Sequence, residues 1–81
     1  MALAAEVLYE WREAERTLVL LPSESPERAS VEAAIEAMRD LYQRITRTVP
    51  STASSIANTR ARIDEAHALL RAVRDGRRAG R

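Results

Sequence analysis

The sequence predicts an all-α protein, a three-helix bundle in which the chain runs up, down and up again. Apolar residues recur at intervals of three and four along three segments, the spacing that places them on one face of an α-helix. Two short stretches rich in proline, serine and threonine separate these segments. Both are too short for flexible linkers, so we expect antiparallel neighbours joined by tight corners. The predicted helices cover about residues 3–21, 26–48 and 53–75.

The first predicted helix carries one apolar stripe and ends at a proline. Pro22 disfavours helical geometry at the residue before it, so the helix should stop near Leu21. The stripe consists of Leu3, Ala4, Val7, Leu8, Trp11, Ala14, Leu18 and Leu21.

The second predicted helix has the broadest stripe and should be the most buried. Ser25 is a good N-cap, and Pro26 fits the first helical position, where its missing N–H costs nothing. Pro50 should end the helix near Thr48. Several hydroxyl residues follow, and the sequence does not decide which of them caps the next helix. The stripe consists of Val31, Ala34, Ile35, Met38, Leu41, Tyr42, Ile45 and Val49.

The third predicted helix has a narrower seam that alternates strictly between intervals of three and four. Gly76 is expected to terminate it, because glycine readily adopts the left-handed conformation that closes many helices. Residues 1–75 then form a single domain, and residues 76–81 form a basic tail that should fray. The seam consists of Ile56, Thr59, Ile63, Ala66, Leu70 and Val73.

Helices of equal rise connected in this order impose a register. The first and third helices run parallel, offset by about 53 residues. This arrangement predicts three layers, namely Leu3 with Ile45 and Ile56, then Val7 with Leu41 and Ile63, and finally Trp11 with Ile35 and Leu70. We expect Trp11, Met38, Leu41 and Ile63 in the core.

The chain is small for an independent domain, and it contains no cysteine to supplement its core with disulfides. The bundle therefore either closes within one chain or is completed by oligomerisation. Tyr9, Leu20 and Leu69 lie off the main stripes and form a candidate interaction surface. We expect a homo-oligomer or a helical protein partner.

Glu15 falls within the first stripe, between Trp11 and Leu18, and a buried charge needs a partner. The parallel register brings it level with His67, so Glu15 and His67 form a candidate buried polar pair, with Arg71 as an alternative partner. Asp64 and His67 have the spacing of a carboxylate-histidine metal pair, but further inward-facing acids are lacking. We expect no metal and no cofactor.

Catalytic motifs are also missing. No serine or cysteine nucleophile and no carboxylate pair has an identifiable place near His67. Both glycines lie near the C-terminus, so no glycine-rich phosphate loop exists. We expect a protein that is not an enzyme.

Charge is distributed unevenly along the chain, although the net charge is only +1. The C-terminal segment is basic, and arginine suits bidentate contact with phosphate. Nucleic-acid binding is therefore the alternative function. The sequence shows no helix-turn-helix pattern and no aromatic residues placed for base stacking, which makes this alternative the weaker one. Its candidate anion-binding residues are Arg71, Arg74, Arg77, Arg78 and Arg81.

No apolar run is long enough to cross a membrane, and no basic leader precedes the first helix, so we expect a cytoplasmic protein without membrane contact. The sequence favours a non-catalytic small helical protein that acts as an oligomerisation or protein-interaction module.

Overall fold

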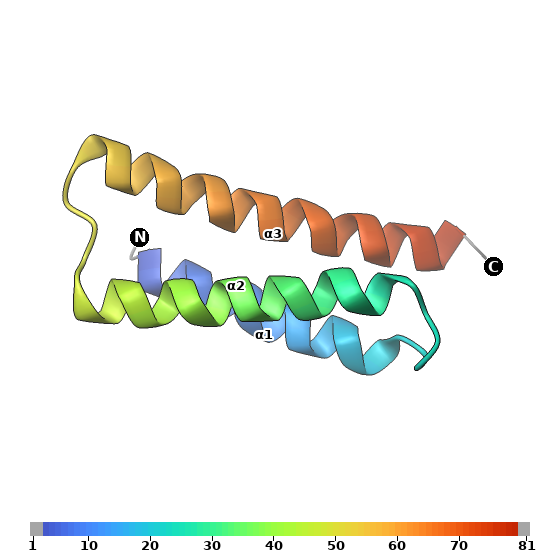
Figure 1. Cartoon of the computed structure of the whole chain (residues 1–81). Helices are drawn as coiled ribbons and strands as arrows, with labels where there is room; N and C mark the ends of the chain where they lie inside the picture. Colours follow the sequence, from blue (N-terminus) through green and yellow to red (C-terminus); the bar gives the residue numbers. More distant parts are fainter. Residues whose placement is uncertain (1–2, 80–81) are drawn as a thin grey trace.

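The computed structural model describes residues 3–79, excluding the side chains of residues 77–79, and this part of the chain contains three α-helices and no strand (Figure 1). They are α1 (Leu3–Leu20), α2 (Glu27–Arg47) and α3 (Ala53–Ala79). Helix α2 runs antiparallel to both others, which gives an elongated bundle of 44 × 19 × 18 Å. The predicted all-α, up-down-up, three-helix fold is confirmed.

The first corner follows the predicted chemistry of its prolines. Pro26 precedes α2 with helical dihedral angles (φ −65°, ψ −23°), and Ser25 Oγ accepts the Glu27 amide at 3.3 Å. The Arg28 guanidinium donates to the carbonyls of Leu18 at 3.3 Å and Leu21 at 3.2 Å. It thereby adds a donor to two carbonyls at the end of α1, of which that of Leu18 also accepts the Leu21 amide at 3.1 Å.

The second corner shows which hydroxyl residue caps α3, a choice that the sequence did not decide. Thr48 leaves α2 with an extended backbone (φ −141°, ψ 103°), as expected shortly before Pro50. Thr52 Oγ1 accepts the amide of Ser55 at 3.0 Å and donates to its hydroxyl at 2.8 Å. Thr52 is therefore the side chain that caps α3.

Two clusters of buried side chains form the core along the bundle. Three of the four predicted core residues, Met38, Leu41 and Ile63, are buried, whereas Trp11 is partly buried and packs against the first cluster. That cluster comprises Val7, Met38, Leu41, Ile45, Ile63 and Ala66. The second comprises Ala14, Leu21, Val31, Leu70 and Val73. The predicted layer of Val7, Leu41 and Ile63 therefore lies within one cluster.

The other two predicted layers are only partly correct. Leu3 and Ile45 share the first cluster, but Ile56 is 42% exposed, because the first turn of α3 lies beyond the core. Val49 is 73% exposed, since α2 ends at Arg47 and leaves it in the corner. In the third layer, Ile35 and Leu70 share the second cluster, whereas Trp11 packs against the first.

Gly76 does not end α3, so this prediction is wrong. The helix continues to Ala79, and no described glycine has a positive φ. A Cβ at position 76 would have no heavy atom within 4 Å, so no close neighbour requires a glycine there. The last two residues of the predicted tail, 80 and 81, lie outside the described residues. Within residues 3–79, no helix combines the length and apolar character needed to cross a membrane.

Candidate functional site

A buried acid does pair with His67, but it is Glu10 and not Glu15. Glu10 is only 6% exposed, and its Oε2 lies 3.0 Å from His67 Nδ1, whereas Glu15 is exposed. The buried positions of α1 are Val7, Glu10, Ala14 and Thr17. Glu10 lies on this line and Glu15 lies beside it, so the partner of His67 is Glu10. The His67 side chain is 52% exposed, so only the acid of this pair is buried and the predicted burial of His67 is wrong.

Glu10 belongs to a row of polar contacts between the parallel helices α1 and α3. Arg60 Nη2 donates to Glu6 Oε2 at 2.8 Å, and Arg74 Nη2 lies 2.5 Å from Glu13 Oε1. Arg74 Nε also donates to the buried Thr17 hydroxyl at 3.2 Å. The α3 members of this polar ladder recur every seven residues and consist of Arg60, His67 and Arg74. Its α1 members are Glu6, Glu10, Glu13 and Thr17.

The arginines of the ladder hold two of its acids ionised. The hydrogen bond from Arg60 lowers the pKa of Glu6 below its ordinary value of 4.5 and raises the pKa of Arg60. Likewise, the hydrogen bond from Arg74 is the main cause of a lowered pKa at Glu13. Each of these carboxylates on α1 is paired with an arginine on α3, so the two ion pairs hold α1 and α3 together.

The ladder also engages one of the predicted anion-binding arginines. Arg74 contacts Glu13 and Thr17, whereas Arg71 is exposed. The side chains of Arg77 and Arg78, and all of Arg81, lie outside the described residues. The heptad spacing of Arg60, His67 and Arg74 was visible in the sequence. The sequence did not show how α1 is rotated about its own axis, so the spacing of these three residues did not identify their partners on α1.

The predicted interaction surface separates into two places. Tyr9 is 57% and Leu20 60% exposed, and both lie on α1. Leu69 is only partly buried, packs against the second core cluster and lines a groove to which α1 contributes no residue. The three residues therefore do not form one continuous surface.

That groove lies between α2 and α3 and encloses about 580 Å³. Ala34, Met38 and Ala66 are buried at its base, and Ala33 and Ala37 are exposed along its α2 side. We refer to it as the α2–α3 groove. Its lining comprises Ser30, Ala33, Ala34, Ala37 and Met38 from α2, with Arg62, Glu65, Ala66 and Leu69 from α3.

The other two seams of the bundle contain larger side chains. Trp11 and Tyr42 pack between α1 and α2 with their ring centroids 5.9 Å apart, and the polar ladder lies between α1 and α3. Small side chains line much of the α2–α3 seam, which explains why it is hollow. Leu69 was predicted as an interaction residue, and Ala34 and Ala66 as members of the apolar stripes, whereas the exposed Ala33 and Ala37 were not predicted.

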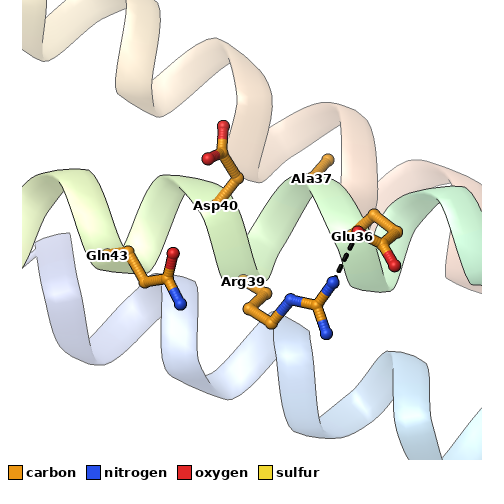
Figure 2. Close-up of a pocket in the computed structure, with 5 residues that line it drawn as sticks. All are labelled: Glu36, Ala37, Arg39, Asp40 and Gln43. Atoms are coloured by element: carbon orange, nitrogen blue, oxygen red, sulfur yellow. Dashed lines mark hydrogen bonds and ion pairs between the residues drawn. The ribbon is translucent and has the colours of Figure 1, made fainter.

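A second depression lies on the outer surface of α2 alone (Figure 2). Ala37 and Asp40 point toward α3, whereas Arg39 and Gln43 point toward α1. Arg39 is paired with Glu36 at 2.6 Å, and Asp40 with Arg44 at 2.7 Å. A depression lined by one helix, with its charges already paired, offers no convergent set of groups to a ligand.

Two buried polar atoms, Glu10 Oε1 and Trp11 Nε1, lack hydrogen-bond partners in the described part of the chain. Among the described residues, no three histidine, cysteine, aspartate or glutamate side chains are grouped to hold a metal ion. Comparison with protein-family models, curated proteins and solved structures finds no match to this chain.

Proposed function

We propose that this protein is a non-catalytic helical-bundle module that associates with other helices through its α2–α3 groove. The observation that carries the proposal is the groove itself, an apolar channel of about 580 Å³ on the outside of a bundle whose core is already closed. Small side chains let another helix approach closely, and covering the groove would remove apolar surface from water.

The lining of the groove combines apolar and polar side chains. Leu69 and the alanines supply apolar surface, while Arg62, Glu65 and Ser30 supply polar groups. Protein interfaces likewise combine apolar surface with polar and charged groups. A helix laid into such a groove would extend the three-helix bundle by one member.

Replacing an exposed alanine of the groove tests this proposal. Ala37→Glu places a charge in the groove without entering the core, so it should reduce association while leaving helicity unchanged. Light scattering at high protein concentration should give a mass above one chain for the unmodified protein and a mass near one chain for Ala37→Glu.

Ala68→Glu is the matched control, because Ala68 is an exposed alanine of α3 that does not line the groove. It should associate like the unmodified protein. Equal masses for Ala37→Glu and Ala68→Glu would contradict a role for the groove, and a single-chain mass for the unmodified protein at every concentration would contradict oligomerisation.

Nucleic-acid binding through the basic end of α3 stays a prediction, as does a cytoplasmic location. The contacts of Arg74 with Glu13 and Thr17 count against the nucleic-acid alternative, because an arginine already paired has less to gain from a phosphate. The exposed Arg71 is the remaining candidate among the described side chains.

A further inference from the structure

Two charged side chains of the α2–α3 groove have no partner within the described residues. Arg62 and Glu65 are exposed and line the groove, and neither takes part in an ion pair or hydrogen bond among the described residues. In the polar ladder, by contrast, Arg60, His67 and Arg74 all contact α1. On its groove side α3 therefore presents a basic and an acidic group, one helical turn apart, that have no partner on α2.

The order of these charges defines the surface that would complement them. A complementary helix must present an acid opposite Arg62 and a base opposite Glu65, at the same three-residue spacing. Helix α3 of a second copy meets this requirement when it runs antiparallel. A two-fold axis that crosses α3 midway between the two residues places Arg62 of each copy opposite Glu65 of the other.

We propose that the occupant of the α2–α3 groove is a second copy of this chain, packed antiparallel about that two-fold axis. This inference rests on the proposed function, since it names the partner of the same groove. This axis turns the groove-lining faces of the two copies toward each other. Two Arg62–Glu65 pairs then form between the copies.

Charge reversal tests this geometry directly. In the dimer of Arg62→Glu, the new acid of each copy faces Glu65 of the other copy. In the dimer of Glu65→Arg, the new base of each copy faces Arg62 of the other copy. Sedimentation equilibrium should show each variant with a dimer dissociation constant about tenfold or more above that of the unmodified protein, because like charges meet twice. The doubly exchanged variant Arg62→Glu/Glu65→Arg restores both pairs and should return to within about threefold of the unmodified value.

Mixing the two single variants provides an independent readout. Arg62→Glu and Glu65→Arg attract one another in a heterodimer, so an equimolar mixture should associate more tightly than either variant does alone. The matched controls are Arg12→Glu and Glu15→Arg, which reverse two exposed α1 charges at the same spacing that also lack partners in residues 3–79. Both should dimerise like the unmodified protein.

The outcomes separate this inference from the proposed function. If the reversals weaken association no more than the α1 controls do, while Ala37→Glu still abolishes it, the groove is an interface but the two-fold arrangement is wrong. If neither the reversals nor Ala37→Glu changes the association, both proposals fail.

Discussion

Glu13 lies between two guanidinium groups where α1 meets the last third of α3. Arg74 Nη2 lies 2.5 Å from one carboxylate oxygen and Arg16 Nη1 lies 2.5 Å from the other. Together they lower the pKa of Glu13, and Arg74 makes the largest contribution. Because the pKa is lower in the folded protein than its ordinary value of 4.5, ionised Glu13 stabilises the fold above that pH. This contribution is lost as the pH falls through the lowered pKa.

Glu13→Gln should therefore reduce the free energy of unfolding at pH 7 by about 0.5–1 kcal/mol, a range that allows for the partial exposure of Arg74. The difference from the unmodified protein should shrink as the pH falls through the lowered pKa of Glu13, because protonation weakens the same pair. Urea unfolding followed by circular dichroism at pH 7 and at a series of acidic pH values measures this. Glu15→Gln is the control, and a Glu13→Gln protein no less stable than Glu15→Gln at pH 7 would contradict the account.

The pattern of apolar residues in the sequence did not reveal that Glu10, and not Glu15, is the acid that faces His67. The apolar stripe of α1 includes Trp11 and Leu18, which are only partly buried, and Trp11 packs against Tyr42 of α2. The buried line is rotated toward α3, by less than the 100° that one residue spans. A pattern of apolar residues does not identify acids on the side of α1 that faces α3. The sequence therefore predicted that His67 pairs with an acid of α1, but it assigned the wrong acid.

At the scale of elements, the corners were the most predictable part of the fold. Pro22, Pro26 and Pro50 restrict the backbone whatever the rest of the chain does, and the helix ends lie within one residue of prediction at both corners. The cap of α3 was not predictable, since several hydroxyl residues compete and only the path of the backbone selects Thr52. The end of α3 was misassigned because glycine permits a helix end without requiring one.

Thr52→Ala should destabilise the protein by about 1 kcal/mol, because it removes the acceptor of the Ser55 amide at the start of α3. Thermal or urea unfolding measures the loss. Ser54→Ala, at an exposed position in the same turn without a hydrogen-bond partner in residues 3–79, should change stability little. Equal effects of the two substitutions would show that Thr52 does not cap the helix.

At the scale of the whole molecule, the three seams of the bundle differ in character. Aromatic packing fills the seam between α1 and α2, ion pairs join α1 to α3, and small side chains leave the seam between α2 and α3 hollow. The fold class could be predicted from the helical spacing of apolar residues and from the prolines at the corners. The groove could not be predicted, because it depends on which alanines of α2 lie beside which residues of α3.

The most direct test of self-association through this groove is a dilution series of the ¹⁵N-labelled protein followed by NMR. We expect dilution to shift the amide resonances of residues 30–40 and 62–69, while those around Tyr9 on α1 stay unchanged and helicity is retained. Spectra that do not change with concentration, or shifts concentrated around Tyr9 and Leu20, would contradict the account.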